Sequence, residues 1–379
     1  MEKSRNVNYP GMFDLLKGIV MIGIILTHIN EIIPAGAQYG GELSFLKKAV
    51  FALPEILSLG NATIPMLFLI SGYGFTSINL KKSVKKQSKQ LLRPYLFTGI
   101  AVAVVHFVCH FCAFRYLPGA SKQTGIVFLS HLLGLRTGIQ VHGVQLCSIG
   151  SVWFLLALFE GWILLAIVIN YLPQKSCWVF AICSIVLYYL IPLVVPPWIA
   201  YTFCLNSIFL CVGNLYLGMQ LKEHDWLWKP LPQIVWIFLG LPAVGCLSAA
   251  CLSIEPSQFS EMPIVIQMFI GLVYIAGGEC TAFLMMRIAV RLNHCQNWLF
   301  DKIRIVGRYS IWVICAHTIE SQGLLWYLFV DRMKGHEFDA FLIMIVVRGG
   351  LIFALCYLFY LVDRKLRRIR RQRRVRGNV

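Results

Sequence analysis

The chain has 379 residues, of which 58% are hydrophobic and 13% are charged, and its mean hydropathy is +0.71. A soluble domain is typically about a quarter charged, so the composition excludes a soluble globular protein and predicts a polytopic membrane protein. The formal net charge of +17 favours either nucleic acid or a membrane surface as a partner, and the positions of the charges distinguish the two.

Apolar stretches long enough to cross a bilayer, about 20 residues each, follow one another along the whole chain. We expect an all-α membrane protein with about ten transmembrane helices around a central cavity. Because no polar stretch is long enough to bury its own core, residues 1–363 should form one membrane domain, followed by a basic tail at 364–379. The expected spans are 13–33, 56–79, 95–115, 151–171, 177–195, 199–220, 231–253, 263–286, 305–329 and 339–362.

The first span, FDLLKGIVMIGIILTHINEII, carries Asp14, Lys17, His28 and Glu31. It lacks a small-residue cleavage site, so we expect it to remain as a helix. Lys17 and His28 lie about 20° apart around such a helix and about 16 Å apart along it, and Asp14 can pair with Lys17 at i,i+3. One face therefore presents a cation at a membrane surface and, deeper in the bilayer, a group that accepts a proton near neutral pH.

Ionisable groups inside a span are costly and mark candidate functional sites. This face suits a long substrate with an anionic end and a reactive end, such as a coenzyme A thioester. The structural alternative is a buried His28 bonded to a backbone carbonyl. Glu31, one turn further on, either holds the imidazole in one tautomer or is an interfacial residue at the helix end.

The second span contains Asn61, Thr63 and Pro65, which predict a bent helix whose freed backbone groups are satisfied by neighbours or water. Near its end, Ser71 and Tyr73 flank a glycine, where small residues allow helices to approach closely. These two residues are candidates for either a structural role or an acceptor site.

Three further regions of the sequence contain candidate functional or structural features. The segment HFVCHFC in the third span offers His and Cys at helical spacing, but ordinary packing is favoured over a metal site, and no metal is expected. The long connection at 116–150 contains the apolar run Ile126–Leu135, which is too short to span and predicts a re-entrant or interfacial helix. Arg348, within the last span, should face a partner or a water-filled cavity.

The cations are distributed asymmetrically. With a cytoplasmic N-terminus, most of the 34 Lys and Arg residues fall on the cytoplasmic side, including those of the tail DRKLRRIRRQRRVRGNV. The positive-inside rule then places both termini in the cytoplasm. We expect the tail to anchor the topology and touch anionic membrane lipid, and we expect no nucleic-acid partner.

Six blocks occur in an order that resembles the acyltransferase-3 family of integral membrane acyltransferases, across nearly the whole chain. In that family a basic residue, usually Arg, precedes a His by ten intervening residues in the first span, and Lys17 and His28 fit this spacing. Lys in place of Arg keeps the charge but loses the bidentate geometry. The blocks are FDLLKGIVMIGIILTH, IPMLFLISGYGFTS, KKQSKQLLRPYLFTG, GSVWFLLALFEGW, LCVGNLYLGMQLKE and IVGRYSIWVICAH.

The resemblance implies a ten-helix protein of the cell (inner or plasma) membrane that transfers an acyl group, commonly acetyl from acetyl-CoA, to a carbohydrate on the far side. By resemblance His28 is the catalytic base, and Lys17 and Arg93 contact the phosphates of coenzyme A. We expect Asp14, the partner of Lys17, to belong to the same donor-binding region. Trp153 belongs to a family motif, so it is either an interfacial anchor or a neighbour of the acceptor pocket. His317 matches a late family His with a structural or acceptor-site role.

The sequence therefore predicts an acyltransferase that uses acyl-CoA as a donor substrate and has no permanently bound cofactor. The main rival is a transporter or flippase of a lipid-linked sugar, which also has many spans and buried polar groups. A membrane sensor without catalysis is the third interpretation. The oligomeric state, the acceptor glycan and the size of the acyl group are left open by the sequence.

Overall fold

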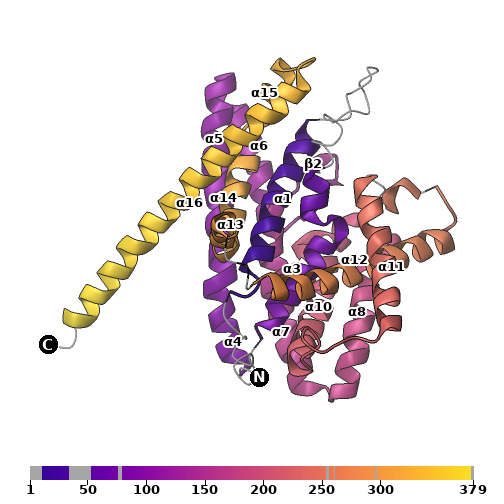
Figure 1. Ribbon diagram of the computed structural model, residues 1–379. Helices are drawn as coiled ribbons and strands as arrows, with labels where there is room; N and C mark the ends of the chain where they lie inside the picture. Colours follow the sequence, from indigo (N-terminus) through magenta and orange to yellow (C-terminus); the bar gives the residue numbers. More distant parts are fainter. Residues whose placement is uncertain are drawn as a thin grey trace.

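A computed structural model of the chain describes residues 11–33, 53–75, 79–252, 256–259, 261–293, 295 and 297–376. It is a bundle of helices with one short β-hairpin (Figure 1). Helix α1 (Asp14–Ile32) begins, and helix α16 (Glu337–Arg376) ends, toward the same end of the bundle, here called the terminal end. The opposite end, called the far end, holds the last turn of α1 and the hairpin.

The remaining elements follow in chain order. They are helical residues 53–58, η1 (Gly60–Ala62), α3 (Thr63–Tyr73), α4 (Leu80–Gln87), the π-helical η2 (Ser88–Leu92), α5 (Arg93–Phe114), α6 (Leu117–Leu132), β1 (Ile139–Val141), β2 (Val144–Leu146), η3 (Gly150–Val152), α7 (Trp153–Tyr171), α8 (Gln174–Val194), α9 (Pro197–Ala200), η4 (Thr202–Cys204), α10 (Leu205–Glu223), α11 (Gln233–Cys251), η5 (Pro256–Phe259), α12 (Ile264–Leu292), α13 (Trp298–Arg308), α14 (Ser310–Gly323) and α15 (Trp326–Arg332).

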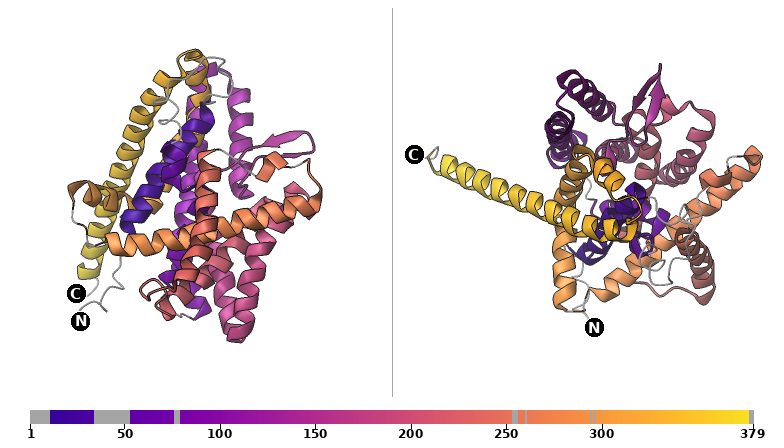
Figure 2. Two further views of the ribbon diagram at one scale, coloured as in Figure 1. Left: turned by 45° about the vertical axis from the view of Figure 1, so that its right-hand side comes forward. Right: turned by 90° about the horizontal axis from the view of Figure 1, so that it is seen from above.

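The expected fold class is confirmed. Within the described residues, nine helices are long and apolar enough to cross a membrane, and α14 with α15 adds a tenth span if this bent pair is counted as one. Residues 76–78 and 253 of the expected spans lie outside the described residues. Figure 2 shows that α12 crosses the bundle obliquely and that α16 extends away from it.

The second span is interrupted at Leu59 and η1, upstream of the proline at which the sequence predicts a bend. Leu59 adopts a left-handed conformation with φ of 59°, η1 follows, and Pro65 lies in the first turn of α3, where its missing N–H is no loss. Asn61 ties the break to its neighbours: its amide donates to the carbonyl of Tyr274 at 2.5 Å, and its oxygen accepts from the Cys246 thiol at 2.5 Å.

The long connection between the third and fourth spans contains more structure than expected. Its helix α6 covers 16 residues and packs against α5, so the apolar run Ile126–Leu135 supplies only its last part. The hairpin follows, with Ile139 opposite Leu146. This segment then returns to the bundle at the start of α7, which lets it form one wall of the site described below.

The expected span 305–329 is wrong as a single helix. Residues 298–308 form α13, which Figure 1 views nearly end-on, across the long axes of its neighbours, and which packs on α1. The span itself begins at Ser310 and bends by 60° between α14 and α15. A side chain at Gly307 would collide with the backbone of α1 at Asp14, so the glycine allows this close contact.

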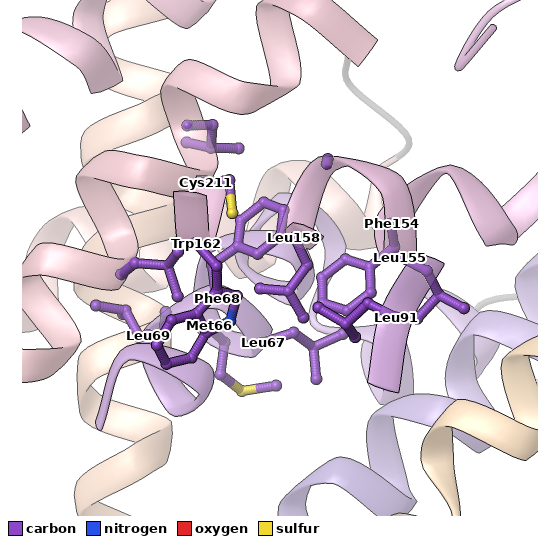
Figure 3. Close-up of a cluster of buried hydrophobic side chains, with 14 of the residues drawn as sticks. Met66, Leu67, Phe68, Leu69, Leu91, Phe154, Leu155, Leu158, Trp162 and Cys211 are labelled. Atoms are coloured by element: carbon purple, nitrogen blue, oxygen red, sulfur yellow. The ribbon is translucent and has the colours of Figure 1, made fainter. Parts of the chain in front are cut away.

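The core lies where α3 meets α7 and α10. Figure 3 shows side chains Met66–Leu69 of α3 interleaved with those of α7. Phe68 is fully buried and stacks on Phe154 with 4.9 Å between ring centroids. A side chain at Gly72 would collide with the backbone of Leu215 in α10. The expectation of close helix approach at the end of the second span is therefore confirmed.

Candidate active site

A cavity of about 760 Å³ lies in the bundle, bounded by α1, the break in the second span, the segment from the hairpin to α7, α12 and α14. Its lining is mixed, with apolar side chains from the spans and polar ones from the irregular segments. A cavity of this size with a few convergent polar groups is typical of a small-molecule site. The central cavity expected from the sequence is thus present.

One face of α1 forms a wall of the cavity. Met21, Ile24, His28 and Glu31 line it, at the spacing of three and four residues that places side chains on one helix face. Lys17 continues the same row one turn toward the terminal end, outside the lining. The predicted common face of Lys17 and His28 therefore leads along the helix into the cavity.

The His28 ring is held at both nitrogens. Its Nδ1 lies 2.7 Å from Oε2 of Glu31, and its Nε2 lies 3.1 Å from Oγ of Ser151, which precedes α7. A carboxylate accepts hydrogen bonds, so the proton of neutral His28 belongs on Nδ1, and Nε2 is left with a lone pair facing a hydroxyl. This arrangement gives an imidazole suited to removing a proton from a hydroxyl group in the cavity.

A second imidazole lies against the first. The rings of His28 and His317 stack with 5.2 Å between centroids, and Nδ1 of His317 lies 2.9 Å from Oε1 of Glu320. The two pairs repeat one local pattern, His followed three residues later by Glu. Nε2 of His317 is buried and has no partner among the described residues, so its hydrogen-bonding capacity is unused in this structure.

Behind His317 lies a buried ion pair that the sequence did not reveal. Arg348 binds Glu320 through Nε at 3.0 Å to both carboxylate oxygens and through Nη2 at 2.7 Å to Oε1, and both side chains are at most 1% exposed. The Trp326 indole donates to the same carboxylate at 3.0 Å. Arg348 also donates to the His28 carbonyl at 3.3 Å. The expected partner of Arg348 is therefore Glu320, and the pair connects α14 and α16 to the site.

The cation near the start of α1 is paired as the spacing predicts. Nζ of Lys17 lies 2.8 Å from Asp14, whose other oxygen lies 3.5 Å from Nε of Arg308 on α13. The Asp14 side chain is 7% exposed, whereas that of Arg308 is 60% exposed. The Asp14 carboxylate thus contacts two cations at the terminal end. Lys17, Asp14 and Arg308 form a cluster with a net positive charge, and Lys17 lies one helical turn from the cavity lining, toward the terminal end.

Three other candidate residues lie away from the cavity lining. Arg93 is exposed at the start of α5, and the described residues offer it no ion pair. Ser71 donates to the Leu67 carbonyl of its own helix at 2.8 Å. Tyr73 is buried edge-to-face against Phe13, with 5.4 Å between ring centroids. The packing of Ser71 and Tyr73 fits the structural role that the sequence left open for them.

Trp153 lines the cavity and is covered by Arg136, whose guanidinium carbon lies 4.5 Å from the ring centroid. Sequence reasoning missed Arg136 and Ser151 because only tertiary contacts bring these two residues to the cavity. It also missed Glu320, although the repeated His-x-x-Glu spacing is a signal that points to it.

Within the described residues no group of three or more His, Cys, Asp or Glu side chains forms a metal site, and His106 instead contacts Thr124 at 3.0 Å.

The comparison with protein families assigns a family to nearly the whole chain. A family model described as an acyltransferase domain matches residues 12–361, a range that includes both imidazoles, Lys17, Arg93 and Arg348. No curated protein and no solved structure gives a match. The family match covers nearly the whole chain, and the described residues contain nine helices able to span a membrane, or ten with the bent pair. The chain therefore belongs to the acyltransferase-3 family and is a membrane acyltransferase.

Proposed function

We propose that the protein transfers an acyl group, acetyl in the simplest case, from cytoplasmic acyl-CoA to a hydroxyl of a carbohydrate on the other side of the membrane. The observation that carries this proposal is the His28 imidazole, which has Nδ1 on a carboxylate and Nε2 at 3.1 Å from a hydroxyl in the cavity. An acceptor hydroxyl that takes the place of the Ser151 hydroxyl is presented directly to the base.

The positive cluster of Lys17 and Arg308 supports the donor assignment. It lies toward the terminal end, and the row Lys17, Met21, Ile24, His28 connects it to the cavity along α1. Lys binds phosphate as a point charge, and the pantetheine arm of coenzyme A is comparable in length to the separation of about 16 Å between Lys17 and His28. Arg93 is a second candidate for the donor phosphates, through its planar fork.

The reaction is a direct transfer in this proposal. His28 Nε2 takes the proton as the acceptor oxygen attacks the thioester carbonyl, and the carbon–sulfur bond then breaks. The thiolate leaves and takes the proton from the imidazolium, so no charge accumulates. Glu31 keeps the proton of neutral His28 on Nδ1 and stabilises the imidazolium that forms, as carboxylates do in hydrolase triads. His317 accepts a hydrogen bond from a neighbouring hydroxyl of the sugar.

The orientation follows from the charges. The positive-inside rule places the terminal end in the cytoplasm, so the hairpin and the adjacent wall of the cavity face the opposite side, where the acceptor enters. The last span continues as helix α16 through Arg376, and we propose that its basic end contacts anionic lipid of the cell membrane.

Covalent transfer tests the proposal against the transporter alternative. Membranes that contain the protein are given acetyl-CoA labelled in the acetyl group, and the label is followed into surface glycan, with membranes that lack the protein as the control. Label in the glycan is the expected result. Glycan that crosses the membrane without acquiring label shows a transporter instead. Mass spectra of the surface glycan with and without the protein then identify the acylated sugar.

A further inference from the structure

Arg136 is a cation built into the cavity wall at the far end. It follows α6, lines the cavity, and is held by neutral groups: Nη1 donates to the Tyr188 hydroxyl at 2.7 Å and to Ser207 Oγ at 3.3 Å. Its guanidinium carbon lies 4.5 Å from the ring centroid of Trp153 and 5.5 Å from that of Tyr188. These contacts position the charge but do not neutralise it.

Among the described residues, most other arginines with assigned contacts pair with a carboxylate. Arg348, Arg304 and Arg308 each pair with a carboxylate, and Arg287 donates to two backbone carbonyls, those of Trp226 and Lys229. Among the described residues no Asp or Glu lies within ion-pair distance of Arg136. Arg136 is partly buried on the cavity lining, where an unpaired cation attracts a counter-charge.

The backbone at Arg136 is hydrogen-bonded to the segment that contains Ser151, the hydroxyl partner of His28. Ser148 Oγ donates to the Arg136 carbonyl at 2.7 Å and accepts from the Gly150 N–H at 3.2 Å. Ser151 and Trp153 follow directly, the first bonded to His28 and the second stacked under the guanidinium. One short stretch of chain therefore sets the positions of the cation and of the Ser151 hydroxyl relative to each other.

We infer that Arg136 binds an anionic group, a carboxylate or a phosphate, on the acceptor, so that the protein acylates acidic glycans in preference to neutral ones. This inference rests on the proposed entry of a carbohydrate acceptor into the cavity. Nη2 and Nε of Arg136 have no partner among the described residues and are available as two donors for an oxyanion. The donor phosphates are assigned to the opposite end, where Lys17 and Arg308 cluster.

Ligand binding tests the inference without any need for catalysis. Binding of methyl β-D-glucuronide, methyl β-D-glucoside and inorganic phosphate to purified protein is measured for wild type, Arg136→Gln, Arg136→Lys and Lys122→Gln, an exposed control that also loses one charge. Wild type should prefer the glucuronide to the glucoside, and Arg136→Gln should weaken glucuronide binding by about tenfold or more while Lys122→Gln does not. Binding of phosphate but not of glucuronide assigns the anion to a phosphate group. Equal binding of the two glycosides by wild type, with no effect of phosphate, overturns the inference.

Transfer kinetics separate this inference from the proposed function. With paired acidic and neutral acceptors, the ratio of their kcat/KM values should fall by about tenfold or more in Arg136→Gln. An unchanged ratio overturns the inference and leaves the transfer reaction standing. A raised KM for acetyl-CoA, equal with both acceptors, also overturns it, because Arg136 then serves the donor. If wild type transfers nothing yet binds the glucuronide through Arg136, the proposed function fails and the anion site remains.

Discussion

Replacing Arg348 by Met tests the buried ion pair behind the two imidazoles. The substitution keeps much of the side-chain volume but leaves the Glu320 carboxylate, with a side chain 1% exposed, without its three guanidinium contacts at 2.7–3.0 Å. Breaking a buried pair from one side costs about 3–5 kcal/mol, because an uncompensated charge is left in a low-dielectric interior. The His28 carbonyl also loses its donor at 3.3 Å. We expect Arg348→Met to lower the free energy of unfolding by about this amount.

The measurement is equilibrium unfolding in mixed micelles, with Arg332→Met as a control because Arg332 is exposed on α15. The control should change stability by no more than about 0.5 kcal/mol. In the double variant Glu320→Leu, Arg348→Met the stranded charge is gone, so part of the lost stability should return. A single variant as stable as wild type, or a double variant that loses the sum of two separate effects, would refute the reasoning.

The other predictions concern the transfer reaction. Glu31→Gln should lower kcat by about 10²-fold or less, since the Glu31 side chain is 61% exposed and only orients His28; a rate equal to that of wild type would exclude this role. Lys17→Ala should raise the KM for acetyl-CoA by about tenfold, most at low salt, and an unchanged donor dependence would remove the phosphate role. Ser151→Ala should lower kcat/KM by less than about tenfold, because Ser151 is only a hydrogen-bond partner; an acetyl-serine trapped in wild type without acceptor would contradict direct transfer.

Much of the fold follows from local sequence. The apolar stretches locate the spans because a membrane helix must satisfy its backbone groups internally. Pro65 predicts a bend in the second span, whereas the interruption lies upstream, where the backbone of Leu59 is left-handed. The span at 305–329 was placed wrongly because its hydropathy does not show where α13 ends and α14 begins, and the close contact of Gly307 with α1 is a tertiary feature.

The site was only partly predictable. Helical periodicity placed Lys17 and His28 on one face and paired Asp14 with Lys17, since these relations depend on a single helix. The partners that complete the site come from other elements: Ser151 from the start of the fourth span and the Arg348–Glu320 pair from two late helices. A single sequence contains no signal for such contacts, except where a local pattern repeats.

The most direct test of the account is acetyl transfer by His28→Ala. The variant and wild type are purified, matched by expression level and thermal unfolding, and assayed with labelled acetyl-CoA and the glycan acceptor. Because a general base typically contributes about 10²–10⁴ in rate, the folded variant should transfer acetyl at least about 10²-fold more slowly. Folded His28→Ala protein that acylates the glycan at the wild-type rate would show that this imidazole is not the base.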